Sequence, residues 1–270
     1  MDSIIEVVRC FENSNIIHVD GVINPINDIE IIELELIYAD LETVSKRRER
    51  VKKQLKADKS LAKEDQILER LEKILNEGKS ARSIEFTKEE KEIIKGLHLL
   101  TLKPLMYVAN VDEETIQNPE SNENFKKVKK YAESQNAKVI PICVKLEEEI
   151  SELESEEEKK EFLEMMGLDK SGLDRLVIAS YDILGLMSYL TAGEVEVRAW
   201  TIRKGTKAPQ AAGKIHSDIE RGFIKAEIVS YDDLIKCGSM AKAREKGLIR
   251  MEGKEYTMKE GDIVDFKFNV

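Results

Sequence analysis

The sequence predicts an α/β protein that carries an inserted α-helical hairpin and a C-terminal α+β domain. Short β-branched segments alternate with amphipathic helices in residues 1–27 and 101–189, and this order favours βαβ units in a parallel sheet. Residues 28–100, which lie between them, repeat apolar positions three or four residues apart, as helices do. Residues 190–270 change to short alternating strands, which indicates a second compact domain.

The charge of the 270-residue chain is unevenly distributed. The formal net charge is −10, yet residues 191–270 hold 15 basic and 13 acidic residues, so the acidic excess falls on the preceding part. This distribution excludes a surface that is basic throughout, and it suggests that the two parts meet different partners. No apolar run reaches the ~20 residues that span a bilayer, so we expect no membrane partner.

Cysteines and histidines are few and scattered. The three cysteines are Cys10, Cys143 and Cys237, and the three histidines are His18, His98 and His216. Because no CxxC or similar paired spacing occurs, we expect neither a metal site nor a disulfide framework. The first residues lack the basic segment of a signal peptide, and we expect a cytoplasmic protein.

Three buried strands are predicted in the first part of the chain. Residues 3–11 form a short β-branched run, and residues 104–109 and 138–142 form two more, joined by a lysine-rich helix at 125–135. The strand, helix, strand order implies a right-handed crossover and parallel pairing. The first strand has no earlier strand beside it, so we expect an exposed edge that invites self-association.

The region from about residue 27 to Gly78 predicts two antiparallel helices, the first with Asp28 as its N-cap. The apolar stripe of the first helix is Leu34, Ile37, Leu41, Val44, Val51 and Leu55, with Arg48 at one seam position. The stripe of the second helix is Leu61, Leu68, Leu71 and Leu75. We interpret the hairpin as a structural coiled-coil arm first, and as a docking surface for a protein partner second.

Capping pairs and turns predict the remaining elements. Three helices are expected to begin at Thr87 with Glu90 (residues 87–99), at Ser155 with Glu158, and at Ser171 with Asp174, the last running to about Tyr189. Residues 146–161 contain nine glutamates and two lysines, which predicts a solvated helical surface. The last part predicts a helix at 208–215 and strands at 195–202, 223–230, 256–258 and 263–268.

No P-loop occurs in these 270 residues. A P-loop follows the pattern G-x-x-x-x-G-K-[ST] between a strand and a helix, so that backbone groups wrap the phosphates. Gly78-Lys79-Ser80 matches only the end of that pattern, because Lys73 takes the place of the first glycine and a helix precedes it.

A tetrapeptide after the second strand is the main ligand candidate. Asn110-Val111-Asp112-Glu113 lies where α/β sheets bind ligands, beyond the carboxyl end of a strand. GTPases carry N-K-x-D at this place, and here Val111 replaces the lysine and Glu113 the aspartate, which puts guanine selectivity in doubt. A plain loop that caps the next helix is the more frequent reading of so short a motif. Cys143-Val144-Lys145 follows the third strand, where GTPases place a second base-contacting loop.

Several segments together resemble the YchF / Obg-like ATPase family over nearly the whole chain. They are VVRCFEN (7–13), ADLETV (39–44), YVANVDE (107–113), SGLDRL (171–176), VRAWTI (197–202), KGTKAPQAAG (204–213) and FKFNV (266–270). The resemblance implies a P-loop NTPase-type nucleotide-binding domain, an inserted coiled-coil arm and a C-terminal TGS domain of β-grasp type. It also implies ribosome association and a preference for ATP over GTP.

The resemblance also assigns nucleotide base contacts. They fall on Asn110, Val111 and Glu113, with Cys143, Val144 and Lys145 nearby. Phe11 matches an aromatic residue near the base in the family, although a core role is at least as plausible.

The family pattern begins with a P-loop and two switch segments that hold Mg²⁺ and the γ-phosphate, and this chain starts after all of them. We therefore expect the C-terminal portion of a ribosome-associated ATPase of this type, with ATP weakly bound or not bound and Mg²⁺ bound only in a full-length protein. Phosphoryl transfer depends on phosphate positioning and metal charge, so we expect no hydrolysis by this chain and leave its status as an enzyme open. The alternative is a non-enzymatic module that binds RNA, ribosomes or protein through the arm and the TGS-like domain.

Residues 195–225 hold seven basic residues against three acidic ones. The basic residues are Arg198, Arg203, Lys204, Lys207, Lys214, Arg221 and Lys225. A basic strip on a small sheet can contact RNA phosphates, while an ordinary charged surface explains the composition equally well. The ribosome association that the resemblance implies favours RNA.

Overall fold

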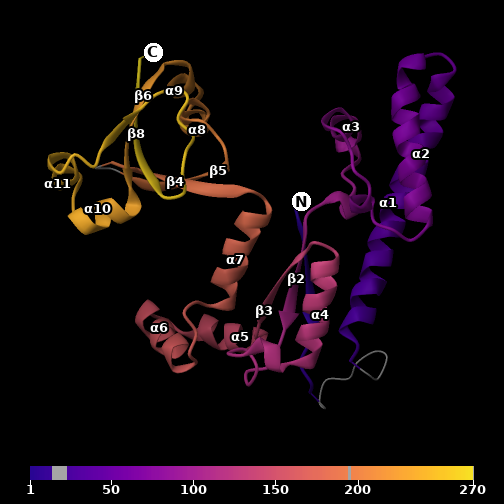
Figure 1. Ribbon diagram of the computed structural model, residues 1–270, viewed down its shortest axis with the longest axis horizontal. Coiled ribbons are helices and arrows are strands. Elements are labelled where there is room, and N and C mark those ends of the chain that lie inside the picture. Colours follow the sequence, from indigo (N-terminus) through magenta and orange to yellow (C-terminus); the bar gives the residue numbers. More distant parts are fainter. Residues whose placement is uncertain (14–22, 194–195, 270) are drawn as a thin grey trace. The chain divides into compact units, whose positions relative to one another are not determined.

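The computed structural model describes residues 1–13, 23–193 and 196–269, and Figure 1 shows its elements. The chain forms two compact units, Met1–Val177 and Ile178–Val270. His18, and the ends of two predicted segments at Val195 and Val270, lie outside the described residues.

A three-stranded parallel sheet organises the first unit, as predicted. The strand order is β1-β2-β3, and the strands are β1 (Ile4–Arg9), β2 (Leu105–Asn110) and β3 (Lys138–Ile142). Exposure alternates along β1, and Val8 and its register partner Ala109 on β2 are buried on the same face. That face packs against Ile29 of helix α1 (Pro25–Leu55) and Val128 of helix α4 (Glu123–Ser134).

Helix α1 begins earlier than the sequence indicated. Asn24 is its N-cap, with the side chain accepting a hydrogen bond from Asn27 N, and Pro25 occupies the first helical turn. The predicted Asp28 cap is therefore wrong, and Asp28 lies inside the first turn. The buried stripe also differs, because Leu34 is 41% exposed.

Helix α1 has two successive packing partners, which explains the altered stripe. Near its start Ile29 faces the sheet, and further along Ile37, Val44 and Val51 face the second helix of the hairpin. The second helix is α2 (Ala62–Asn76), reached through a short 3-10 turn (Lys59–Leu61), and its buried residues are Ile67, Leu68, Leu71 and Leu75. Figure 1 shows α1 and α2 side by side.

The ends of the next two helices follow the predicted signals in part. Gly78 has φ of +72° just past the end of α2, as a helix-terminating glycine requires. Thr87 and Glu90 form the predicted capping box of α3 (Lys88–Ile94). This helix ends five residues before the predicted residue 99, because the chain tightens into a 3-10 turn and His98 then adopts φ of +51°.

A buried carboxylate fastens α1 to the segment that leads into β2. Asp40 is 2% exposed, and its Oδ1 accepts a hydrogen bond from Leu100 N at 2.7 Å. Its Oδ2 accepts from Thr101 N at 2.7 Å and from Thr101 Oγ1 at 2.6 Å. The Thr101 hydroxyl in turn accepts from Ala81 N at 3.0 Å. Three segments distant in sequence thus meet at one side chain.

Helices on the opposite face of the sheet complete the first unit. They are α5 (Val144–Glu152), α6 (Glu156–Met165) and the first half of α7 (Gly172–Ile183), whose second half belongs to the second unit. The capping box predicted for Ser155 and Glu158 is present on α6. The prediction that the last helix runs to Tyr189 is wrong. Gly185, at φ of +62°, follows the end of α7, and residues 186–192 form a strand with Met187 and Tyr189 on the buried side.

The second unit is a five-stranded mixed sheet with helices on both faces. The strand order is β5-β4-β8-β6-β7, with β4 and β8 parallel and the other pairs antiparallel. The strands are β4 (Leu186–Ala192), β5 (Val197–Arg203), β6 (Phe223–Ser230), β7 (Arg250–Glu252) and β8 (Asp262–Phe268). The helices are α8 (Ala208–Ile215), α9 (Ser217–Arg221), α10 (Tyr231–Cys237) and α11 (Met240–Glu245).

One predicted strand of the second unit is not formed. Residues 256–258 make only an isolated bridge between Lys207 and Thr257, and the three-residue strand β7 lies just before them in the chain. The single tryptophan, Trp200, packs against the α8 side of the sheet. In the described part of the chain, no helix is long and apolar enough to cross a membrane.

We expect the Asp40→Ala variant to lower the free energy of unfolding of the first unit by about 3 kcal/mol, because three buried donors lose a charged acceptor. Urea unfolding followed by far-UV circular dichroism measures this change. Fluorescence of Trp200, which reports on the second unit, should keep its midpoint. Glu42→Gln, an exposed change on the same helix, is the control, and equal midpoints for the two variants would contradict the role of Asp40.

A cluster of ionisable groups lies between the sheet and α1. Glu6 of β1, Glu33 of α1 and Arg82 interact electrostatically, and Tyr131 donates a hydrogen bond to Glu33 at 3.1 Å. Burial raises the pKa of Glu6 to about 7, with Glu33 adding to the rise and Arg82 opposing it. The Tyr107 hydroxyl is buried in the same region, with no hydrogen-bond partner among the described residues.

The raised pKa of Glu6 predicts a pH-dependent stability. The folded state holds this proton up to pH ~7, whereas the unfolded state releases it near its usual value of 4.5, so the free energy of unfolding falls as pH rises between the two. Glu6→Gln should remove that fall and stabilise the protein by about 1 to 2 kcal/mol above pH ~7. Thermal or urea unfolding across this range tests it, with Glu12→Gln, an exposed change, as control. Identical pH profiles for wild type and Glu6→Gln would refute it.

Candidate functional site

The carboxyl ends of the three parallel strands bring two predicted loops together. Cys10 N donates to Asn110 O at 2.8 Å, and Val111 N donates to Ile142 O at 2.9 Å, so backbone pairing continues just past the strands. The loops after β1, β2 and β3 therefore start side by side, at the edge where parallel sheets bind ligands.

Asn110 joins the loop after β2 to the start of α5. Its Oδ1 accepts a hydrogen bond from Val144 N at 3.1 Å. This bond fixes the orientation of the side-chain amide, because the oxygen must face the Val144 N–H. The amide NH2 group makes no hydrogen bond to the described residues, so it can donate to a ligand.

Glu113 and Lys145 form an ion pair across the same two loops. The Glu113 side chain is 37% exposed and that of Lys145 is 68% exposed. The hydrogen bond to Glu113 raises the pKa of Lys145, so the lysine stays charged. Asp112, between the two candidate residues, accepts hydrogen bonds from Thr115 N at 2.9 Å and Thr115 Oγ1 at 2.7 Å, and so stabilises the turn.

Other predicted site residues are placed less openly. Val111 is 1% exposed, and its N–H donates to Ile142 O. Of its backbone groups, only the carbonyl remains to contact a ligand. Cys143 is buried, and burial raises its thiol pKa. Phe11 is half-buried, with the Arg9 guanidinium 4.7 Å above its ring centre. Sequence reasoning missed both this stacking and Asn122, which caps α4 and donates to Cys10 O at 3.0 Å.

These groups fit the base of a nucleotide better than its phosphates. A carboxylate accepts hydrogen bonds, as from the exocyclic amino group of adenine, and an amide NH2 donates to a ring nitrogen. Phosphate binding needs a wrapped backbone or a cluster of cations, and no P-loop pattern occurs in the sequence. Among the described residues, no group of three or more histidine, cysteine or acidic side chains is arranged to hold a metal ion.

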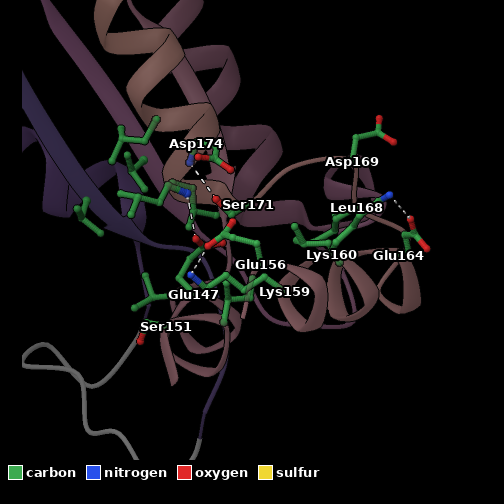
Figure 2. Close-up of a pocket in the computed structure, with 18 of the residues that line it drawn as sticks. Glu147, Ser151, Glu156, Lys159, Lys160, Glu164, Leu168, Asp169, Ser171 and Asp174 are labelled. Atoms are coloured by element: carbon green, nitrogen blue, oxygen red, sulfur yellow. Dashed lines mark hydrogen bonds and ion pairs between the residues drawn. The ribbon is translucent and has the colours of Figure 1, made fainter. Parts of the chain in front are cut away.

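A cavity of about 850 Å³ lies on the face of the sheet opposite α1 and α4. Its floor is apolar, with Ile5 and Val7 of β1, Val108 of β2 and Ile142 of β3, and α5, α6 and α7 form its walls. Figure 2 shows polar side chains around this floor, among which Glu147 and Ser171 accept hydrogen bonds from the start of α7 and Lys160 pairs with Glu164. The cavity therefore combines an apolar floor with polar walls.

Glu147 lies in one wall of this cavity and bonds to the start of α7 (Figure 2). The Glu147 carboxylate accepts hydrogen bonds from Gly172 N at 2.6 Å and Leu173 N at 3.0 Å, at the start of α7. A Cβ at position 172 would lie 2.7 Å from the Ile142 side chain and 2.8 Å from the Glu147 carboxylate, so a larger residue would displace one of these side chains. Glu147 is thus a structural cap.

The seven basic residues predicted to bind RNA belong to several elements of the second unit. Arg198 and Arg203 are on β5, Lys204 and Lys207 precede α8, and the others are Lys214 on α8, Arg221 on α9 and Lys225 on β6. Ion pairs engage four of them: Arg198 with Glu196, Lys204 with Asp182, Lys207 with Glu255, and Arg221 with Asp218. Local acidic residues thus partly neutralise this surface.

A denser basic segment escaped the sequence analysis. Residues 46–63, around the connection between α1 and α2, contain nine basic and two acidic residues. A count of charges over residues 46–63 would have identified this segment. The count over the whole first part is acidic and therefore did not.

Comparisons with known proteins agree over the full length. The chain is 55% identical to a protein of Bacillus subtilis (strain 168) named ribosome-binding ATPase YchF, covering 100% of this chain and 74% of that protein. It is 45% identical to the protein of that name from Escherichia coli O157:H7, covering 100% of this chain and 73% of that one. A family model described as "YchF-GTPase_C: Protein of unknown function (DUF933)" matches residues 186–269.

A solved structure has a similar fold. The structure of the Schizosaccharomyces pombe YchF GTPase matches with a TM-score of 0.81 at 39% identity, covering 98% of this chain and 72% of that one. The fold and the loops at the sheet edge define an α/β protein of the nucleotide-binding, GTPase-like class. Within that class, the chain belongs to the YchF family.

Proposed function

We propose that this chain supplies the base-recognition and ribosome-binding parts of a YchF-type ATPase. The observation that carries the proposal is the Asn110–Val144 hydrogen bond beside the Glu113 carboxylate at the carboxyl end of the sheet. The relatives from Bacillus subtilis and Escherichia coli are named ribosome-binding ATPases, and this supports the same pair of properties here. The coiled-coil arm and the TGS domain of β-grasp type belong to the same proposal, as does a cytoplasmic location.

Adenine is the base that these groups would favour. Adenine presents an exocyclic amino donor, which Glu113 can accept, and ring nitrogens, to which the Asn110 amide can donate. Guanine presents a carbonyl oxygen at the corresponding position, and an oxygen beside a carboxylate is unfavourable. ATP would therefore bind in preference to GTP, with Val111, Cys143, Lys145 and Phe11 shaping the loop around the base.

Hydrolysis is a separate question from base binding. The 270 residues contain no P-loop pattern, and the described residues contain no metal-ligand cluster. The groups that would position phosphates and Mg²⁺ are thus not among the residues that form this site. We propose that a protein made of these residues alone binds adenine nucleotide weakly and does not turn it over.

Titration of the full chain with a fluorescent ATP analogue tests the base site. We expect competition by ATP to exceed that by GTP by at least tenfold, about 1.4 kcal/mol. Glu113→Gln should weaken ATP binding by about tenfold, because a charged acceptor becomes a neutral amide. Glu114→Gln, an exposed neighbour with the same charge change, is the matched control.

Two outcomes would overturn the nucleotide proposal. Equal affinities of wild type and Glu113→Gln would remove Glu113 from the site, and turnover of Mg-ATP above background would show that phosphate-binding groups are present. Ribosome binding without any nucleotide binding would instead favour the non-enzymatic module.

The edge strand β1 supports a second, smaller proposal, self-association. β1 pairs only with β2 among the described strands, and its side chains Ile5 and Val7, on the face that carries the cavity, are 39% and 63% exposed. Such an edge can pair with another chain. Sedimentation at rising protein concentration should show a dimer that Val7→Lys abolishes, and a monomer at every concentration would refute the proposal.

A further inference from the structure

The tip of the α1–α2 hairpin carries an unusual concentration of positive charge. Residues 50–59 contain five basic residues and one acidic residue, Asp58. The basic residues are Arg50, Lys52, Lys53, Lys56 and Lys59, and all five are exposed. None of them forms an ion pair with any residue that the structure describes.

Three other cations of the hairpin, Arg47, Arg48 and Lys63, behave differently. Arg48 is 12% exposed and pairs with Glu72 at 2.5 Å, Asp65 at 3.4 Å and Glu69 across the two helices. Arg47 pairs with Glu64 at 2.6 Å, and Lys63 pairs with Glu89 at 2.5 Å. These pairs join the helices to one another and to α3, so their cations serve the fold.

The helix itself accounts for only part of the charge at the tip. Lys52 and Lys53 lie in the last turn of α1, where cations stabilise the helix C-terminus. Lys56 and Lys59 lie beyond the helix, and Arg50 lines a groove of about 510 Å³ between the hairpin and residues 93–97. Like charges spaced three or four residues apart repel, so this set is unfavourable for the isolated chain.

We infer that the hairpin tip binds the phosphate backbone of RNA, and that it is the main RNA-binding surface of this chain. Long, exposed and unpaired cations on a rigid support suit phosphate contacts, which depend on charge and not on base sequence. Residues 39–85 contain no aromatic side chain, so the tip cannot stack on bases. The expected ligand is therefore structured RNA, read by its backbone. The inference rests on the ribosome binding proposed above.

The alternative basic surface of the second unit is less suited. Four of its seven candidates are paired with local acidic residues, as described above. The tip holds five unpaired cations within ten residues, whereas those of the second unit extend over residues 198–225. Charge density, which determines counterion release, thus favours the tip.

The test compares two variants of the full chain that lose the same charge. The tip variant combines Arg50→Gln, Lys52→Gln, Lys53→Gln, Lys56→Gln and Lys59→Gln. The control combines Lys236→Gln, Lys242→Gln, Lys246→Gln, Lys254→Gln and Lys259→Gln, five exposed lysines outside every candidate site. Binding to a short fluorescent RNA duplex and to purified ribosomes is measured as a function of salt.

The salt dependence gives the expected result. With four or five phosphate contacts, wild type should lose affinity for the duplex by about a hundredfold or more between ~50 and ~200 mM salt. The tip variant should bind at least about tenfold more weakly at low salt and with a much flatter salt dependence, and the control should match wild type. The unfolding midpoint of the tip variant should change little, because the loss of Lys52 and Lys53 at the helix C-terminus is offset by the removal of repulsion at the tip.

Each remaining outcome overturns the inference in a recognisable way. If the tip variant binds the duplex as wild type does, the tip is not the RNA surface. If only ribosome binding is lost and the duplex never binds, the partner is an acidic protein surface. If wild type binds neither probe, the proposed ribosome association fails together with the inference. If wild type and the tip variant bind ribosomes equally well, the inference fails and the ribosome association stands.

Discussion

The carboxylate of Asp40 holds the first unit together at one buried point. A charge that is removed from water is tolerated only when donors surround it, and here two backbone N–H groups and one hydroxyl do so. The hydroxyl of Thr101 in turn accepts a hydrogen bond from Ala81 N, in the segment that follows the second helix of the hairpin. The hairpin, the turn that follows it and the entry to β2 are thus fixed to one another. Because α1 also places Ile29 on the sheet, one helix connects the ligand edge to the arm.

The cations of the hairpin differ in their ion pairs. Arg47 and Arg48 pair with carboxylates of α2, whereas the described cations of the tip, residues 50–59, form no ion pair. Arg48 shares its guanidinium among three carboxylates of α2, which orients one helix against the other. A partly buried cation at a seam position would be costly without such partners. The carboxylates at the start of α2, Glu64 and Asp65, are taken by Arg47 and Arg48, and the cations of residues 50–59 are exposed to solvent. The acidic excess of the first part arises elsewhere, in residues 25–45 of α1, which hold six acidic residues and no basic one, and in α5 and α6, which hold nine glutamates against three lysines.

The ligand edge is built from backbone geometry more than from reactive side chains. Asn110 is oriented by a backbone N–H, Asp112 by the turn that it caps, and Val111 by burial in the core. Glu113 is thus presented at the surface by a rigid loop, with Lys145 as its counterion. Such a loop suits recognition of a flat, polar base. The apolar floor on the other face of the sheet, with Val7 at its exposed edge, adds contact area but no chemistry.

Much of this protein could be predicted from the sequence because its signals are local. The β-branched runs of β1, β2 and β3, the capping boxes at Thr87 and Ser155, and the glycine at position 78 each act within a few residues, and the structure contains them where predicted. The N-V-D-E tetrapeptide could be placed at a strand end for the same reason. The errors occurred where distant contacts decide. Leu34 fits a helical stripe yet is exposed, because α1 changes partner along its length, and residues 186–189 continue a helical pattern but pair with β5.

The sequence by itself thus determined the elements, the parallel order of the first sheet and the candidate base loop. Only the tertiary structure decided which charges are neutralised. Arg47, Arg48 and the five cations of the tip look alike in the sequence, and their difference depends on whether a glutamate of α2 or α3 lies opposite. Helix packing decides which side chains face one another across the hairpin. The contacting residues are 17 to 27 positions apart in the sequence, so no local sequence pattern predicts the pairs.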